Sequence, residues 1–166
     1  MTVRGKGDAV VKVLFVCTGN ICRSPTAEGV FRALAAREGL ADRISTDSAG
    51  TDSYHVGEAP DGRASAAAKA RGISLDDLRA RQVRAGDFET FDLVVAMDRG
   101  HHSRLSRLCP RGREQRLHLF MRYAPQFGVP DVPDPYYGGA DGFEQVLDMI
   151  EAGCDGLLGH IRNTML

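Results

Sequence analysis

A strand-like run joined to a helix-like run by a short loop is the feature that most constrains this fold. Residues 11–16 (VKVLFV) are mostly apolar and β-branched, residues 26–31 (TAEGVF) have a helical pattern, and residues 17–24 (CTGNICRS) lie between them. A tight turn from a strand into a helix directs the free backbone N–H groups of the helix N-terminus into the loop. The positive end of the helix dipole then lies beside Cys17 and favours its ionisation. The loop therefore predicts an anion-binding site that contains a nucleophilic thiol.

The remaining sequence alternates between strand-like and helix-like segments. Pro25 suits the first turn of a helix, and Gly39 and Gly72 are suited to end two helices. We expect strands at 10–16, 43–48, 91–97 and 116–120, helices at about 25–38, 61–71, 99–108 and 142–161, and a loop at 123–139. The alternation predicts one α/β domain with a short, twisted parallel sheet of about four strands and helices on both faces. Ligands of such sheets bind at the carboxyl ends of the strands, where the loop 17–24 begins.

Composition and charge narrow the classes of partner. The 166 residues carry a net charge of -1, which gives no basic footprint for nucleic acid. No apolar run approaches the roughly 20 residues that a membrane-spanning helix needs. Residues 1–9 are polar, lack the apolar stretch of a signal peptide, and predict a flexible tail before a domain at 10–166. We expect a cytoplasmic protein that contacts neither nucleic acid nor membrane. Export by a route that needs no signal peptide stays open as an alternative.

The cysteines predict neither a disulfide framework nor a metal site. They are scattered unevenly, and their spacing from the histidines does not match that of metal ligands. The four cysteines are Cys17, Cys22, Cys109 and Cys154. We therefore expect no metal and no cofactor, and structural roles for Cys109 and Cys154.

Two separate motifs resemble the low-molecular-weight protein tyrosine phosphatases. They are residues 16–25 (VCTGNICRSP) and residues 134–137 (DPYY), and the likeness also includes residues 46–51 (TDSAGT) and 79–82 (RARQ). A cysteine and an arginine five residues apart are weak evidence alone, but the combination with these neighbours is specific. The resemblance implies an α/β enzyme that hydrolyses phosphotyrosine in signalling proteins through a phosphocysteine. It also implies that phosphate and other oxyanions bind as product-like ligands.

The residue types of the loop suit this chemistry. Cys17 would be the nucleophile, and Arg23 would hold two non-bridging phosphoryl oxygens through parallel hydrogen bonds. Gly19 permits close backbone approach, and Asn20 can adopt a left-handed conformation, although both also occur in ordinary turns. Ser24 could donate a hydrogen bond to the sulfur or could cap the helix. The resemblance places Thr18, Ile21 and Cys22 in the same substrate-binding loop.

Asp134 is the candidate acid and base. A phenolate leaving group has a conjugate acid with a pKa of about 10, so its departure at neutral pH calls for a proton donor. The resemblance assigns Asp134 to protonate the leaving tyrosine and then to activate water against the phosphocysteine. The alternative is a turn aspartate before Pro135, and Asp131 and Asp141 are weaker candidates for the same role.

Aromatic side chains are expected around the phosphate loop. Tyr54, Tyr136 and Tyr137 would form the walls of a deep slot, with His55 either at its entrance or in solvent. Relatives often carry Trp in place of Tyr54. Bacterial relatives that act on phosphoarginine tend to carry threonine at the position of Ile21, so Ile21 favours phosphotyrosine.

Two further features concern the support and the oxidation of the loop. Leu78 stands where many relatives have a loop-bracing histidine, so we expect Ser48 to bond Asn20 without that partner and the loop to be slightly looser. Cys22 is close enough to Cys17 along the loop for a reversible disulfide under peroxide, or it is only a small packing residue.

Two other functions compete with the phosphatase. Arsenate reduction needs additional cysteines, and the region 82–89 contains none. A phosphotyrosine-binding module would need neither a nucleophile nor an acid, whereas this chain has candidates for both.

Overall fold

The computed structural model describes residues 10–137 and 139–166, so the tail predicted at residues 1–9 lies outside the described residues. Four parallel strands form one sheet in the order β2-β1-β3-β4. The strands are β1 (Val11–Cys17), β2 (Ile44–Gly50), β3 (Leu93–Ala96) and β4 (Leu117–Leu119). The predicted parallel sheet of about four strands is confirmed.

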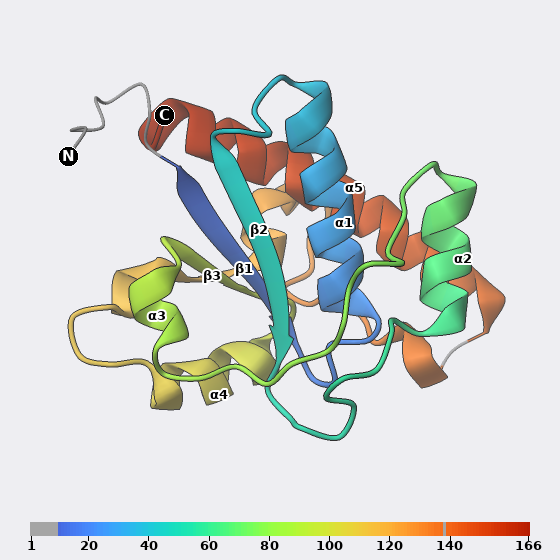
Figure 1. Ribbon diagram of the computed structural model, residues 1–166, viewed down its shortest axis with the longest axis horizontal. Coiled ribbons are helices and arrows are strands. Elements are labelled where there is room, and N and C mark those ends of the chain that lie inside the picture. Colours follow the sequence, from blue (N-terminus) through green and yellow to red (C-terminus); the bar gives the residue numbers. More distant parts are fainter. Residues whose placement is uncertain (1–9, 138) are drawn as a thin grey trace.

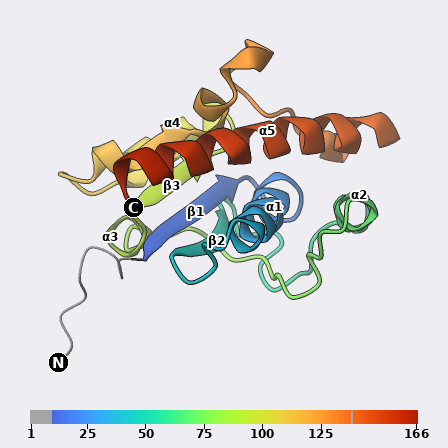
Figure 2. The ribbon, with the colours of Figure 1, turned by 90° about the horizontal axis from the view of Figure 1, so that it is seen from above.

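Helices cover both faces of this sheet. They are α1 (Arg23–Arg37), α2 (Gly62–Ala70), α3 (Asp87–Thr90), α4 (Arg99–Leu108) and α5 (Ala140–Thr164). Figure 1 shows α1 and α5 on one side of the strands and α3 and α4 on the other. The long helix α5 extends past the strands toward α2, against which it packs (Figure 2). None of the helices in the described part is long and apolar enough to span a membrane.

Most predicted elements are present, with shifted ends. Helix α4 has the predicted bounds, whereas α1 begins at Arg23 rather than Pro25. The earlier start is possible because the first helical N–H groups have no intrahelical partner, so Pro25 removes no helical hydrogen bond. Strand β3 is shorter than the predicted 91–97. The helix α3 was not predicted, because four residues are too few to show helical periodicity.

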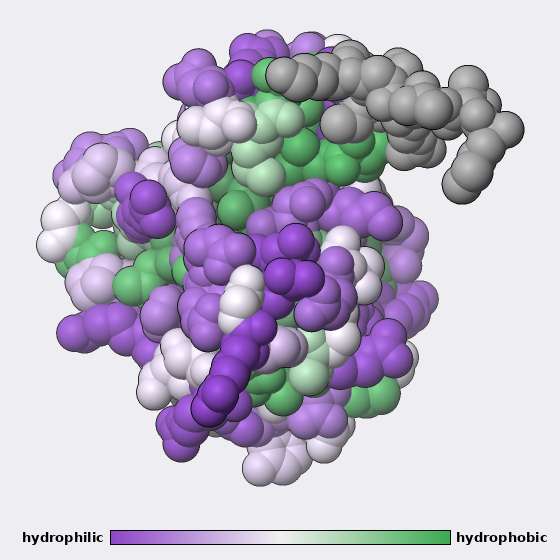
Figure 3. All heavy atoms as spheres, turned by 90° about the vertical axis from the view of Figure 1, so that its left-hand side faces the viewer, coloured by the Kyte–Doolittle hydropathy of each residue, from purple (hydrophilic) through white to green (hydrophobic). Residues whose placement is uncertain are grey.

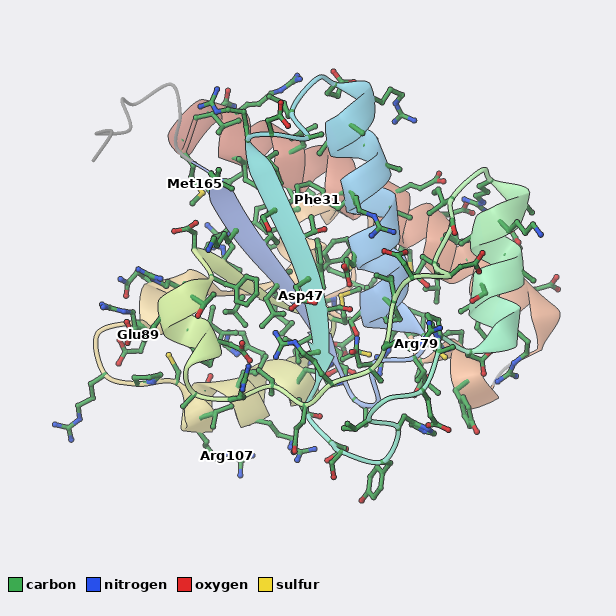
Figure 4. All side chains as sticks on the ribbon, in the orientation of Figure 1. Phe31, Asp47, Arg79, Glu89, Arg107 and Met165 are labelled. Atoms are coloured by element: carbon green, nitrogen blue, oxygen red, sulfur yellow. The ribbon has the colours of Figure 1, made fainter. Side chains whose placement is uncertain are left out.

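The central strand β1 is buried on both faces. On one face Phe15 makes edge-to-face contacts with Phe31 of α1, at 5.7 Å between ring centroids, and with Phe120, at 6.1 Å. Figure 4 labels Phe31 on this helix. On the other face Leu14 packs in a cluster with Phe88 of α3. Each of these large side chains contributes about 1.5–3 kcal/mol on burial, so β1 is held rigidly from both sides.

Hydrophilic side chains cover most of the face shown in Figure 3, where hydrophobic ones are exposed only in separate groups. The position of the ligand site follows from the topology of the sheet. The chain runs from β1 through α1 to β2 on one side of β1, and β3 then lies on the other side. This reversal creates a crevice at the carboxyl ends of β1 and β3. Cys17 ends β1, and Asp98 follows β3 closely.

Candidate active site

The loop after β1 turns its carbonyl groups outward. The N–H of Thr51 donates to the carbonyl of Cys17 at 2.8 Å, and the N–H of Asp61 donates to the carbonyl of Ile21 at 2.8 Å. Within the described part of the chain, no backbone carbonyl accepts from the N–H groups of residues 18–22. These N–H groups and the N-terminus of α1 are therefore free to bind an anion inside the loop.

Two backbone features allow the loop to close tightly. Asn20 has φ +58° and is the one non-glycine residue with positive φ in the described part, so the predicted left-handed conformation is confirmed. Gly50, at the end of β2, lies directly against the loop. A Cβ at this position would be 2.6 Å from the carbonyl oxygen of Thr18, which explains why glycine stands there.

A chain of hydrogen bonds connects Cys17 to the protein interior. The sulfur of Cys17 lies 2.9 Å from the hydroxyl of Ser24. The side-chain amide of Asn20 donates to Ser24 at 2.8 Å and to Ser48 at 2.9 Å, as predicted for Ser48. Because Ser24 accepts from Asn20, its own proton is shared between the sulfur and the carbonyl of Ala49, which is 3.4 Å away. Ser24 does not cap α1, whose N-cap position is Cys22 and has no side-chain cap.

We call this chain of hydrogen bonds through Ser24, Asn20 and Ser48 the brace of the loop, and it continues to Glu28 rather than to a histidine. Ser48 donates to the carboxylate of Glu28 at 2.7 Å, and Leu78 packs in an apolar cluster with Leu75. Burial raises the pKa of Glu28, because desolvation disfavours the carboxylate, and the Ser48 hydrogen bond opposes this shift. The carbonyl oxygen of the Asn20 side chain accepts from the backbone N–H of Arg81 at 3.0 Å. Asn20 thus has three partners without the histidine, and the looser loop stays a prediction.

Arg81 is in turn fixed from two sides. Its guanidinium pairs with Asp47 of β2 at 3.0 Å and with Asp87 at 3.1 Å. Figure 4 labels Asp47 on this strand. The backbone of Arg81 therefore presents its N–H to Asn20 from a position that ion pairs hold in place.

Arg23 is buried beside the loop, with 5% of its side chain exposed. Its Nη1 donates to Asp98 at 2.9 Å and to the backbone carbonyl of Val132 at 3.0 Å. Its Nη2 lies 3.3 Å from Nε2 of His101 and 3.7 Å from the carboxylate of Asp134. Both protons of Nη1 therefore have acceptors, and Nη2 has an acceptor in His101.

The loop forms the floor of a cavity of about 230 Å³. It is lined by Cys17, Thr18, Gly19, Ile21, Cys22, Arg23, Tyr54, His55, Asp134 and Tyr136. This set includes most of the predicted site residues, and it also includes His55. Tyr54 is 82% exposed, so it stands on the rim rather than in a closed wall.

Two predicted substrate-binding residues differ from this picture. Asn20 does not line the cavity, because its side chain is turned into the brace and is 2% exposed. Tyr137 lies in the 3-10 turn Pro135–Tyr137, but its side chain lies outside what the structure describes.

Asp134 reaches the cavity from the loop before α5. One carboxylate oxygen accepts from the backbone N–H of Tyr136 at 3.0 Å, which is the predicted turn interaction. The other faces Arg23, and 40% of the side chain is exposed. Asp131, the weaker candidate, instead pairs with Arg99 at 3.2 Å, and its pKa is lowered by hydrogen bonds from Arg99 despite an opposing desolvation.

Cys22 is buried next to the cavity. Desolvation first, and then the negative charges of Asp61 and Cys17, raise its pKa to about 12. Cys22 packs in an apolar cluster with Ala64 and Phe143. Neither Cys109 nor Cys154 lines the cavity.

The sequence reasoning missed the residues behind the loop. Asp98, His101 and Glu28 belong to no recognisable motif, and the spacing of the histidines bears only on metal binding. One signal was present, because Asp98 follows a buried strand at the sheet edge where ligands bind.

Comparisons with known proteins identify the family. The sequence model of the family described as low molecular weight phosphotyrosine protein phosphatase matches residues 12–165. The chain is 49% identical over 154 residues to a low molecular weight protein-tyrosine-phosphatase of Streptomyces coelicolor, covering 91% of this chain and 93% of that protein. A crystal structure of a protein tyrosine phosphatase from Entamoeba histolytica with Hepes in the active site superposes with a TM-score of 0.90 at 38% identity, covering 94% of this chain and 99% of that one. A Drosophila arginine phosphatase superposes with a TM-score of 0.85 at 31% identity, covering 92% and 98% of the two chains.

The fold and these matches define the chain as a phosphatase. It belongs to the low molecular weight phosphotyrosine protein phosphatase family. The predicted family and enzyme class are confirmed, whereas the roles of individual residues stay predictions.

Proposed function

We propose that this protein hydrolyses phosphotyrosine in other proteins in two steps, beginning with attack by Cys17. The thiolate of Cys17 attacks phosphorus, and the bond from phosphorus to the tyrosine oxygen breaks. Asp134 gives its proton to that oxygen, so tyrosine leaves as a neutral phenol. Arg23 and the loop N–H groups hold the three non-bridging oxygens as the phosphoryl group flattens. The free N–H groups and the buried guanidinium of this loop support that assignment.

The second step restores the enzyme. Water attacks phosphorus, its proton passes to the carboxylate of Asp134, and the sulfur–phosphorus bond breaks to give thiolate and inorganic phosphate. The hydroxyl of Ser24, 2.9 Å from the sulfur, donates to the departing thiolate. The observation that carries the proposal is that Cys17, Arg23 and Asp134 line one cavity of about 230 Å³. The buffer anion in the active site of the Entamoeba relative supports oxyanion binding here.

The pocket favours phosphotyrosine over phosphoarginine. Ile21 presents an apolar side chain to the cavity, and Tyr136 on the rim can contact an aromatic ring. The guanidinium of Arg63 lies 5.2 Å from the ring centroid of Tyr136 and holds that ring in place. Because a Drosophila relative is an arginine phosphatase, both substrates need to be measured. A higher kcat/KM for a phosphoarginine peptide than for a phosphotyrosine peptide would reject the preference.

The role of Asp134 is tested by changing the leaving group. We expect Asp134→Ala to lower kcat/KM for phenyl phosphate by about 10²–10⁴-fold and kcat/KM for p-nitrophenyl phosphate much less, because kcat/KM reports the first step alone and nitrophenolate leaves without a proton. Asp131→Ala is the matched control, since Asp131 pairs with Arg99 outside the cavity. An equal fall in kcat/KM for both substrates in Asp134→Ala would move the acid elsewhere. Turnover of either substrate by the wild-type protein would also reject the alternative of a phosphotyrosine-binding module.

Rapid quenching followed by mass spectrometry tests the covalent step. We expect a phosphoryl group on Cys17 in the wild-type protein and none in Cys17→Ser. Full activity of Cys17→Ser would end the proposal. An arsenate reductase would instead consume thiol reductant with arsenate. No reductase activity is expected, because beyond Cys17 and Cys22 neither of the other two cysteines, Cys109 and Cys154, lines the cavity to carry a disulfide outward.

We also propose that Cys22 protects Cys17 from irreversible oxidation in a reducing, cytoplasmic environment. Peroxide would oxidise the Cys17 thiolate to a sulfenic acid, and the thiol of Cys22 would displace water from it to form a disulfide. Both cysteines line the same cavity. Peroxide inactivation should be reversed by dithiothreitol in the wild type but not in Cys22→Ser. Equal recovery of both proteins would exclude protection by Cys22.

A further inference from the structure

His101 takes part in neither proposed step, yet it is buried against the group that would hold the phosphoryl oxygens. The residue is 4% exposed and lies in the first turn of α4. Its Nε2 is 2.8 Å from the hydroxyl of Thr18 and 3.3 Å from Nη2 of Arg23. Its Nδ1 is 3.1 Å from the carboxylate of Asp98. The imidazole therefore bridges the phosphate loop, the arginine and the start of α4.

These contacts select one tautomer of the ring. A guanidinium nitrogen only donates, so Nε2 must present its lone pair to Arg23, and a carboxylate only accepts, so Nδ1 must carry the proton. The opposite tautomer would set one N–H against another and a lone pair against Asp98. Nδ1 has no well-aligned hydrogen bond among the described residues, so its interaction with Asp98 is mainly electrostatic.

The surrounding charges keep the ring neutral. Burial first, and then the positive charge of Arg23, lower the pKa of His101 to about 4, against the opposing charges of Asp98 and Asp134. The positive charge of Arg104 also lowers this pKa. A neutral imidazole can accept a hydrogen bond from Arg23, whereas an imidazolium would repel it.

We propose that His101 is a positioning residue that holds the guanidinium of Arg23 and the side chain of Thr18 in place for the phosphoryl group. This inference rests on the proposed function, in which Arg23 binds that group. Nη1 of Arg23 is fully used by Asp98 and Val132, so His101 is the acceptor that fixes the other end of the guanidinium. Without it, Nη2 is free to turn toward the carboxylate of Asp134, now 3.7 Å away. That turn would remove a phosphate ligand and pair the catalytic acid with a cation.

Two variants of His101 separate acceptance by Nε2 from simple packing. His101→Leu fills the space without an acceptor, and His101→Gln places an amide oxygen near the position of Nε2. His102→Leu, on the next residue of α4, is the matched control because its side chain does not line the cavity. Turnover of p-nitrophenyl phosphate, the competitive inhibition constant of inorganic phosphate, and alkylation of Cys17 are measured for all three and for the wild type.

We expect His101→Leu to lower kcat/KM by about 10- to 100-fold, the range for losing one hydrogen bond to a charged group. Phosphate should bind more weakly by a similar factor. Alkylation of Cys17 by iodoacetate, whose carboxylate Arg23 attracts, should slow, while alkylation by neutral iodoacetamide should not. His101→Gln should recover most of each loss, and His102→Leu should match the wild type. If His101→Leu does not fold, His101→Ala carries the same expectations.

Three results would overturn the proposal. The first is that His101→Leu, even if less stable, keeps the wild-type inhibition constant of phosphate and the wild-type ratio of the alkylation rates with iodoacetate and iodoacetamide. The second is that His101→Gln recovers none of the activity, phosphate binding or alkylation lost in His101→Leu. The third is that His102→Leu loses as much as His101→Leu. Wild-type turnover in the same assay tests the proposed function separately, because a phosphatase that is insensitive to His101 rejects only the positioning role.

Discussion

Replacement of Asn20 should show how strongly the phosphate loop is held. The side chain donates to Ser24 and Ser48 and accepts from the N–H of Arg81, and it is 2% exposed. Asn20→Ala removes these three hydrogen bonds, each of which contributes about 1 kcal/mol on balance. Alanine at the observed φ of +58° adds about 1 kcal/mol of backbone strain. The expected loss in the free energy of unfolding is therefore about 4 kcal/mol.

Asn20→Gly separates the two contributions. Glycine also loses the three hydrogen bonds, but it adopts positive φ without strain, so its loss should be about 3 kcal/mol. Ser48→Ala should cost about 2 kcal/mol, because it removes the bond from Asn20 and the bond to Glu28. Because Asn20 and Ser48 share a bond, the double variant should lose less than the sum of the single losses.

Urea denaturation at neutral pH measures these free energies, and the denaturant slope checks that unfolding stays two-state. The activity of each variant is measured below its unfolding transition. A loss under 1 kcal/mol for Asn20→Ala would show that the brace is not a stabilising network. A larger loss for Asn20→Gly than for Asn20→Ala would show that the left-handed backbone is not the source of the difference.

Two further predictions concern the close approach at Gly50 and the stability in acid. Gly50→Ala would place a Cβ 2.6 Å from the carbonyl oxygen of Thr18, so the loop must shift and both kcat and stability should fall. Gly62→Ala, with open space around it, is the control and should change neither. Equal behaviour of the two variants in activity and urea assays would contradict this. The lowered pKa of His101, about 4, means that the unfolded chain binds a proton that the folded protein excludes, so this group destabilises the fold as the pH falls from about 6.5 to 4, by up to about 3 kcal/mol. Glu28, whose pKa is raised, acts in the opposite direction. Its contribution to stability is lost as the pH rises from the ordinary pKa of glutamate to the raised pKa of the folded protein. The difference in unfolding free energy between His101→Gln and the wild type should therefore shift in favour of the variant between pH 6.5 and 4, and a constant difference would disprove the assignment to His101.

The sequence predicted the sheet well because its signals are local. Buried parallel strands are continuous apolar runs, and β1 is apolar at every position from Val13 to Val16. The start of α1 at Arg23 was not predicted, because cationic side chains are not expected in the first turn beside the positive end of the dipole. Here the partly buried partner Asp98 offsets that repulsion, and Asp98 is distant in the sequence.

The floor of the site was also predictable, since its residues are consecutive and their types match the chemistry. The positions behind the floor were not, because each depends on contacts between distant segments. Leu78 illustrates the limit. Its identity predicts that the usual histidine brace is missing, but only the folded structure shows that Ser48 donates to Glu28. No local pattern of α1 distinguishes Glu28 from an exposed helical glutamate.

The buried position of Arg23 explains why such a second layer is required. A desolvated guanidinium is costly unless its donors find acceptors, and the N–H groups of the phosphate loop are themselves donors. Asp98, Val132 and His101 satisfy the inner donors in the absence of substrate. They do so without occupying the side that faces the cavity, so the arginine is oriented before the substrate arrives. Substrate binding then needs little reorganisation, because the protein bears the cost of ordering this side chain during folding.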